Sequence, residues 1–219
     1  MKGGKLVVFS LLVMLFFNLN PDLACTTEPI VLPALRQDGG RPLMATLKAR
    51  KSTREFASRS LPLQVLGELL WAGFGVNRPE SGMRTAPSSH NRQEVDIYVA
   101  MQQGLFLYNG VNHVLEPIDD KDIRPITGRQ KFPGLAPVNL IYVVNFDRIP
   151  GVPRQAAIEA AAVSTGAIVQ NVYLYCASEG LAAVVRGWID RAALGQAMAL
   201  GSNQYIIVAQ TVGYPGEEP

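Results

Sequence analysis

The stretch QAAIEAAAVSTGAIVQNVYLYCASEGL, residues 155–181, decides how the rest of the chain is arranged. Up to Glu179 it contains no proline and only two acidic residues. Its apolar side chains recur at the spacing of an α-helix, and few polar residues occupy the opposite face, so the pattern predicts a helix covered on both sides. Such a helix is about 37 Å long, the width of a small domain. Gly180 is placed to end it in the left-handed conformation.

The first half of this predicted helix is made almost entirely of small residues. Alanine, serine and glycine fill most positions between Ala156 and Ala167. Small side chains allow a neighbouring backbone, or the same helix of a second copy, to approach closely. We interpret the helix as a structural spine and look for the chemistry elsewhere.

The composition of the chain excludes several classes of protein. Of 219 residues, 48% are hydrophobic and 17% are charged, which is enough to bury a full core and too apolar for a disordered chain. The net charge is +2 and no basic run or stripe occurs, so nucleic-acid binding has no support. The two cysteines, Cys25 and Cys176, are too few for a disulfide framework, and no HxxxH, CxxC or clustered-carboxylate spacing indicates a metal site.

Residues 1–24 differ in kind from the rest and predict a secretory signal peptide. Lys2 and Lys5 precede an apolar run, Leu6–Phe17, that is about half as long as a bilayer span. We therefore expect an exported protein that is periplasmic or associated with the cell envelope. Attachment to the membrane, by a lipid on Cys25 or by an uncleaved apolar anchor, stays open as an alternative.

The remaining sequence predicts an extended leader and one α+β domain. Residues 25–42 carry three prolines and two adjacent glycines and form the leader, whereas residues 43–219 form the domain. Residues 75–84 predict a polar loop. The apolar run at 138–144 favours a central strand, and Asn109-Gly110 favours a hairpin. We expect helices at 44–51, 62–73, 155–179 and 191–200, and strands at 95–100, 105–108, 113–116, 138–144, 183–185 and 204–212.

Three short segments carry residues that could bind a ligand. The first places three cations and a hydroxyl within five positions, a combination that suits a phosphate group. The second is dense in side-chain donors and acceptors just before a strand. Taken singly, each also fits a solvated surface or ordinary turn chemistry. The segments are Arg50-Lys51-Ser52-x-Arg54, Ser88 to Gln93, and Arg186-Gly187.

Four segments taken in order resemble the nitroreductase family of FMN flavoproteins. Their order and spacing match over about residues 41–215. The hairpin of residues 104–117 is similar to the branch that includes the SagB-type dehydrogenases. The four segments are Arg50-Lys-Ser-x-Arg-x-Phe56, Pro87-Ser-Ser-x-Asn91-x-Gln93, Gly180-Leu181 and Gly213-Tyr214-Pro215.

The resemblance implies an α+β, nitroreductase-like fold with a central, mainly antiparallel sheet flanked by helices. It implies an intertwined homodimer with one FMN in each of two sites at the interface. The implied enzyme is an FMN-dependent oxidoreductase that transfers hydride or electrons between NADH or NADPH and a small organic acceptor, such as a quinone or a nitroaromatic, by a ping-pong mechanism. The chemistry is then centred on the flavin, and no catalytic side chain is expected.

The resemblance also implies a role in FMN binding for nine residues. A cation near the N1 and O2 edge of the flavin stabilises its reduced anion, and Arg54 or Lys51 could supply it. The nine are Arg50, Lys51, Ser52 and Arg54 for the phosphate and the ring oxygens, Asn91 for a hydrogen bond to the ring, Ser89 and Gln93 for the shape of the same loop, and the backbone amides of Arg186 and Gly187 near the flavin N5.

Two features depart from the family pattern. Residues 216–219 read Gly-Glu-Glu-Pro, where many members carry Lys or Arg, so phosphate binding rests on the amino-terminal cations. The Lys-Tyr pair of the azoline-oxidising members has no counterpart here. Three alternatives stay open: a SagB-like FMN dehydrogenase that oxidises a small molecule or a peptide heterocycle, a non-catalytic FMN-binding or carrier protein, and a scaffold without flavin.

Overall fold

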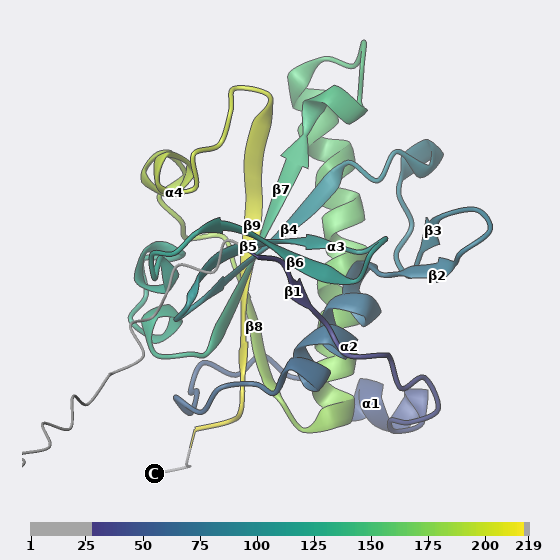
Figure 1. Ribbon diagram of the computed structural model, residues 1–219, viewed down its shortest axis with the longest axis vertical. Helices are drawn as coiled ribbons and strands as arrows, with labels where there is room; N and C mark the ends of the chain where they lie inside the picture. The colour runs from purple at the N-terminus through teal and green to yellow at the C-terminus, as the bar shows by residue number, and fades with distance from the viewer. Residues whose placement is uncertain (1–27, 217–219) are drawn as a thin grey trace, which may run out of the picture.

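A computed structural model describes residues 28–216 of the chain (Figure 1). Its centre is a seven-stranded sheet in the order β1-β6-β5-β4-β7-β9-β8, in which every neighbouring pair is antiparallel. Helices flank the sheet, so the predicted α+β class is confirmed. The expected signal peptide and Cys25 lie outside the described residues.

The elements follow one another in the predicted order, and the structure adds short ones: strand β1 within the expected leader, the pair β2–β3, and four 3-10 helices, η1–η4. The loop expected at residues 75–84 contains a small two-stranded sheet, β2–β3. The elements are β1 (Ile30–Val31), α1 (Leu43–Ala49), α2 (Leu63–Phe74), β2 (Val76–Arg78), β3 (Met83–Arg84), η1 (Ser89–Asn91), β4 (Val95–Met101), β5 (Gly104–Asn109), β6 (Val114–Asp119), η2 (Arg124–Ile126), η3 (Phe132–Gly134), β7 (Val138–Asn145), η4 (Phe146–Arg148), α3 (Arg154–Glu179), β8 (Ala182–Arg186), α4 (Arg191–Ala197) and β9 (Gln204–Gly213).

The predicted spine is α3, the longest helix of the described chain (Figure 1). It begins after Pro153, which lacks the N–H that a helix start would leave unpaired. It ends at Gly180, whose φ of 71° is the left-handed conformation that glycine adopts without strain. Cys176 is buried on the sheet-facing side of α3, where it packs as a small apolar residue.

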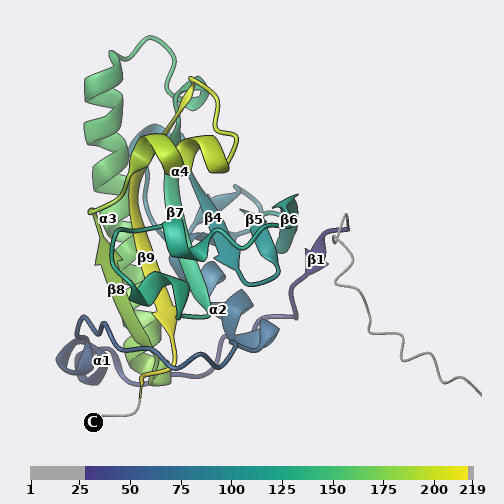
Figure 2. The ribbon, with the colours of Figure 1, turned by 90° about the vertical axis from the view of Figure 1, so that its left-hand side faces the viewer.

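The central strand β7 separates two apolar cores, because successive side chains of a strand point to opposite faces. Leu140 and Tyr142 pack with residues of α2 and α3. Ile141 and Val143 pack on the other face with Leu194 of α4. Burial on both faces explains the uninterrupted apolar run of β7. In Figure 2, α3 runs along the left side of the sheet and α4 lies near its top.

Residues 30–42, here called the strap, pack against the domain. Strand β1 pairs with β6, and Leu32 is buried in the larger core. Farther along, Arg36 forms a two-pronged ion pair with Glu68 of α2, at 2.7 and 3.1 Å. The Arg36 guanidinium lowers the pKa of Glu68 from the ordinary 4.5 to about 2. The strap is therefore fastened by a strand pair at one end and by an ion pair near its middle.

Residues 28–216 contain neither a membrane-spanning helix nor a cluster of metal ligands. None of the helices there is both long enough and apolar enough to cross a bilayer. Over the same residues, histidine, cysteine, aspartate and glutamate do not gather in groups of three that could hold a metal ion.

Candidate functional site

Residues 50–54, here called the cation segment, follow directly after α1 and lie along the edge of the sheet. The main-chain N–H of Thr53 donates to Ala183 of β8 at 2.9 Å. Just beyond the segment, Phe56 forms a bridge with Pro215, and the N–H of Ala57 donates to Tyr214 at 3.0 Å. The fold thus brings together three of the four sequence motifs, which lie far apart along the chain.

The charges of the cation segment are not used within the described chain. Lys51 and Arg54 are exposed, and Arg50 is half-buried with its guanidinium 5.4 Å from the ring centre of Tyr173. None of the three side chains forms a hydrogen bond or an ion pair with another residue of 28–216 that meets ordinary distance limits. A cavity of about 230 Å³ lies beside them, bordered by Lys51, Glu55 and Tyr173 among others. One of the three cations, Lys51, thus lines a hollow at the surface, and Arg50 and Arg54 are its neighbours in the chain.

Ser52 is held by a chain of hydrogen bonds that fixes its orientation. The main-chain N–H of Val185 donates to the Tyr173 hydroxyl at 2.8 Å. The same hydroxyl lies 2.9 Å from the Ser52 Oγ. Either hydroxyl can be the donor in this bond. Ser52 is exposed, so its hydroxyl also remains accessible to a ligand.

Residues 87–93, here called the motif loop, adopt an unusual backbone. His90, Asn91 and Gln93 have φ values of 55°, 52° and 51°, in a region that residues other than glycine rarely occupy. The Ser88 hydroxyl accepts a hydrogen bond from the Gln93 N–H at 2.9 Å, which holds the loop in this form. Strain that is maintained in this way is typical of functional loops.

The predicted residues of the motif loop differ in what their side chains do. Gln93 is used internally, because its amide accepts from Arg84 at 2.6 Å and donates to Gly82 and Asn91. Asn91 accepts that bond with its oxygen but is exposed, and its amide N–H groups have no partner among the described residues. The Ser89 hydroxyl is exposed beside the ring of the neighbouring histidine. Asn91 and Ser89 are therefore available to a ligand, whereas Gln93 supports the loop.

The cation segment and the motif loop contact α3 at different positions along the helix axis. Ser52 contacts Tyr173, whereas Glu94, directly after the motif loop, accepts a 2.7 Å hydrogen bond from Ser164. Nine residues of helix separate the two contacts, which is about 13 Å along the axis. Within one chain, the structure therefore does not place the two predicted groups of residues against each other.

Arg186 is buried, with 4% of its surface exposed. The groups around its charged guanidinium are neutral. Its guanidinium donates to Thr127 at 2.7 Å, to Thr211 at 2.9 Å and to Asn139 at 2.9 Å. No carboxylate of the described chain pairs with it, and burial lowers its pKa to about 10. The side chain of Arg186 is thus fully occupied within the fold, and only its backbone remains for the predicted contact with a ligand.

Gly187 follows Arg186 at the open end of β8. No heavy atom lies within 4 Å of the position where a side chain would begin at this residue. The neighbouring Trp188 is 64% exposed, and its carbonyl accepts from the Arg129 N–H at 3.1 Å. The backbone at Gly187 therefore borders open space, as a close approach to a ligand requires.

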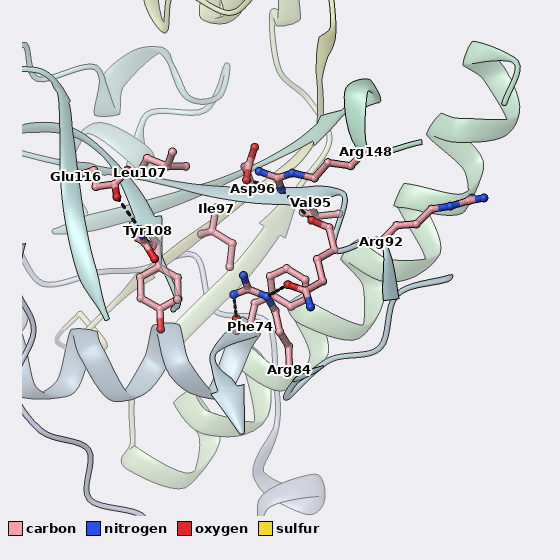
Figure 3. A pocket seen from close by; sticks show the side chains of 13 residues that line it. Phe74, Arg84, Arg92, Val95, Asp96, Ile97, Leu107, Tyr108, Glu116 and Arg148 are labelled. Carbon is pink, nitrogen blue, oxygen red and sulfur yellow. Dashed lines mark hydrogen bonds and ion pairs between the residues drawn. The ribbon is translucent and has the colours of Figure 1, made fainter. Parts of the chain in front are cut away.

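A second cavity lies on the inner side of the motif loop (Figure 3). It measures about 380 Å³, and Arg84 and Arg148 line it together with Asp96. Sequence reasoning did not identify these residues, because they are isolated in the chain and belong to no motif. It also missed the role of Tyr173, since a tyrosine among the apolar positions of a helix carries no signal for a hydrogen-bonded relay.

The fold and the cation segment define an α+β protein that can hold an anionic ligand at the edge of its sheet. The model of the nitroreductase family matches residues 47–214, and the chain belongs to that family. The predicted nitroreductase-like fold is thereby confirmed, and the chain is an oxidoreductase of this family.

Individual relatives agree with this assignment. A crystal structure from Ralstonia eutropha JMP134, described as a nitroreductase, is 45% identical with a TM-score of 0.84 and covers 88% of this chain and 92% of that one. A protein of Methanocaldococcus jannaschii, also described as a nitroreductase, is 30% identical over 148 residues, which are 63% of this chain and 74% of that protein. The NADPH:FMN oxidoreductase of Vibrio harveyi, complexed with NAD⁺, is 20% identical with a TM-score of 0.62 over 81% of this chain and 70% of that one, a likeness of fold alone.

Proposed function

We propose that this chain binds FMN at the cation segment and transfers hydride or electrons between NADH or NADPH and a small organic acceptor, such as a quinone or a nitroaromatic. The observation that carries the proposal is the exposed Ser52 hydroxyl, which Tyr173 holds in a segment with three cations that have no acidic partner within residues 28–216. The family supports a flavin, and the Vibrio harveyi relative supports a nicotinamide partner.

The residues of the cation segment fit the phosphate of FMN. A phosphate group carries nearly two negative charges and prefers Arg, Lys and hydroxyl donors. Arg50, Lys51 and Arg54 have no acidic partner within residues 28–216, and Ser52 adds an oriented hydroxyl. These four residues would hold the phosphate and the ring oxygens.

The other proposed contacts assign a task to each remaining residue. The exposed amide of Asn91 would donate to the ring, with the exposed Ser89 in the same loop, while Gln93 keeps the motif loop in its strained form through its bond to Ser88. The backbone amides of Arg186 and Gly187 would approach the ring at the open end of β8. The flavin itself supplies hydride transfer, and these side chains and amides bind and orient it.

We propose that the protein is a homodimer in which both copies build each site. The level difference of about 13 Å between the cation segment and the motif loop supports this, because one chain does not bring them together. The small-residue half of α3 exposes Ala156, Ala162 and Gly166, with Val163 78% exposed, which leaves an apolar face for a second copy. Sedimentation at micromolar concentration should show a dimer, and Ala161→Arg should disrupt folding or assembly by forcing a charge into packed space.

The two half-reactions would use one site in turn. The proposed contacts are cations, amides and hydroxyls that hold a ring, without a general acid and base among them. Double-reciprocal plots at several acceptor concentrations should then be parallel, whereas intersecting lines would contradict a shared site. His90 is exposed in the motif loop, and His90→Gln should leave flavin reduction within about tenfold, since a positioned acid typically contributes a hundredfold or more.

A direct experiment separates this function from its alternatives. Purified protein that is yellow and steadily consumes NADH or NADPH with an added quinone would support the oxidoreductase, and colourless protein would contradict the flavin site. Yellow protein without turnover would indicate an FMN carrier. Flavin reduction by a small molecule or peptide heterocycle, with no response to NADH or NADPH, would favour the SagB-like dehydrogenase. The β5–β6 hairpin, at the position of the SagB-like sequence pattern, is the feature that keeps this last alternative in view.

We also propose that the protein is exported, on the strength of the basic start and the apolar run of residues 6–17. Residues 1–24 would be the signal peptide, residues 25–42 the leader and residues 43–219 the FMN-binding domain. Mass spectrometry of the mature protein should show a chain that begins at or near Cys25, with or without a lipid. An intact Met1 in the cell-envelope fraction would contradict cleavage.

A further inference from the structure

The cavity on the inner side of the motif loop has the composition of a ligand site. It measures about 380 Å³ and lies where β4 begins, beside the end of α2 (Figure 3). Its polar wall includes Arg84 and Arg148, and its apolar wall includes Phe74, Ile97 and Leu107. Gln93, which supports the motif loop, also lines the cavity, whereas the other eight residues assigned to FMN do not.

Arg84 is a largely buried cation that lacks a carboxylate partner. Its Nε donates to the side-chain oxygen of Gln93 at 2.6 Å, and its Nη1 donates to the Phe74 carbonyl at 2.8 Å. Both acceptors are neutral, and Nη2 has no partner among the described residues. Burial lowers the pKa of Arg84, because water no longer solvates its charge fully. Burying a charge without an opposite charge is costly, and an anion in the cavity would reduce that cost.

Arg148 adds a second cation on the opposite side of the cavity (Figure 3). Its Nη1 donates to Asp96 and to the Gln93 carbonyl, each at 2.8 Å. Asp96 pairs with Arg148 and also attracts Arg84. The second carboxylate, Glu116, accepts a 2.7 Å hydrogen bond from Asn109. Three arginines and two carboxylates line the cavity, so its wall has a formal charge of +1. A third arginine of the wall, Arg92, extends away from the other two in this view.

The backbone near Arg84 is shaped to admit its guanidinium. A Cβ atom at position 110 would overlap the Arg84 Nη1 and would lie 3.2 Å from the Phe74 carbonyl oxygen. Glycine at this position therefore leaves the space that Arg84 occupies. The Arg84 guanidinium also lies 4.7 Å from the ring centre of Phe74, so a flat apolar surface adjoins the charge.

We propose that this cavity binds a small organic carboxylate with an apolar body. Arg84 would grip the carboxylate through its free Nη2, with Arg148 beside it, and Phe74, Ile97 and Leu107 would cover the apolar part. Arginine suits this task because its planar donors match the two oxygens of a carboxylate. The cavity shares only Gln93 with the proposed FMN site, so loss of benzoate binding and loss of FMN binding can be measured separately.

The test uses benzoate, a carboxylate with a flat apolar body, and the purified full-length protein as isolated. Calorimetric titration should give a dissociation constant of about 0.1 to 1 mM, as expected for a ligand of this size. Absorbance at the flavin band is recorded in parallel, because benzoate that stacks on a flavin would shift that spectrum. Heat of binding without a spectral shift supports the cavity. No heat, or heat that follows the spectral shift in every variant, would overturn the proposal.

Matched variants locate the binding. Arg84→Met should weaken benzoate at least tenfold, whereas Lys121→Met, which removes the same charge from an exposed position, should change it less than twofold. Gly110→Ala should weaken binding several-fold at unchanged net charge by displacing the Arg84 guanidinium. Gly110→Ala is also the test of the site if Arg84→Met does not fold. Equal effects of Arg84→Met and Lys121→Met, or unaltered binding in Gly110→Ala, would overturn the site. Inorganic phosphate that binds more tightly than benzoate, and that loses this affinity in Arg84→Met, would overturn the carboxylate class.

Discussion

The cation segment and Arg186 use the same kind of side chain in opposite ways. Arg50 and Arg54 lie at the surface with donors that no described residue accepts. Arg186 is buried, and its donors are taken by Thr127, Asn139 and Thr211. Both regions match the same family motif set, yet one leaves its charges for a ligand and the other uses its charge to fasten the fold.

The difference shows that a motif locates the backbone of a residue more reliably than the task of its side chain. At the cation segment the side chains are the feature that a phosphate would contact. At Arg186 the backbone is the relevant part, and the side chain closes a gap between β7, β9 and the loop that contains Thr127. Substitutions should therefore affect ligand binding in the first region and folding stability in the second.

Arg186→Met should produce the largest effect, a loss of about 3–5 kcal/mol in the free energy of unfolding. The change leaves the Thr127 carbonyl and the Thr211 hydroxyl oxygen without their donor, and each unsatisfied group typically costs about 1–3 kcal/mol. Denaturant unfolding monitored by circular dichroism measures the loss. Arg50→Met is the matched control and should stay within about 0.5 kcal/mol of the wild type. Equal stability of the two variants would remove the distinction between the regions.

Arg54→Ala should show the converse, with little change in stability and weaker FMN binding by about 1.5–3 kcal/mol. This is the range for a hydrogen bond to a charged group, and it corresponds to about one to two decades in affinity. Fluorescence titration of FMN into the flavin-free protein provides the measurement. FMN retention that is unchanged in both Arg50→Ala and Arg54→Ala would rule out the cation segment as the phosphate site.

Tyr173→Phe should have a smaller, mixed effect, because Tyr173 connects the exposed segment to the buried sheet. The change removes the hydroxyl that accepts from the Val185 N–H and that is hydrogen-bonded to Ser52, and a typical hydrogen bond contributes about 0.5–1.5 kcal/mol. We expect stability and FMN affinity both to fall by about that amount. The double variant Tyr173→Phe with Ser52→Ala should lose no more FMN affinity than Ser52→Ala alone. An additive loss would show that Tyr173 does not act through Ser52.

Glu68→Gln tests a third kind of arginine contact, the ion pair between the exposed Arg36 and the Glu68 carboxylate. The pKa of Glu68 lies near 2 in the folded chain and ordinarily at 4.5, so the unfolded chain binds more protons between these values. Stability should therefore fall as the pH drops from about 4.5 to 2, and less steeply in Glu68→Gln. The effect should be the smallest of the four, since Arg36 is 65% exposed and water screens the pair. Urea midpoints of both proteins at pH 7, 4 and 3 measure it, and parallel pH profiles would contradict it.

The sequence predicted the main architecture because its patterns are local and strong. The spacing of apolar residues and Gly180 located α3, and the continuous apolar run of 138–144 identified the central strand β7. The short β2–β3 pair was missed, since strands of two or three exposed residues leave no periodic pattern. Element types and order were thus readable, while the smallest pairings depended on tertiary contacts.

The candidate site was predictable only where its residues are neighbours in sequence. Arg50, Ser52 and Arg54 stand together and could be proposed as one anion site. The hydrogen bond between Ser52 and Tyr173 joins positions 121 residues apart, and Arg84 of β3 donates to the side chain of Gln93 in the motif loop. Distances of this kind follow from the packing of α3 on the sheet, and no pattern within a single segment encodes them.

Residues 53–57 are held by hydrogen bonds to residues near the carboxyl terminus, and this determines when the segment can fold. The three main-chain hydrogen bonds of this segment reach Ala183, Tyr214 and Gly216, which lie 130, 157 and 161 positions away from their partners. Contacts of such long sequence separation form late, because a large loop must close first. During synthesis the cation segment leaves the ribosome long before its supports exist. Any anion that it binds therefore joins an almost finished fold, as a final ligand rather than as a nucleus for folding.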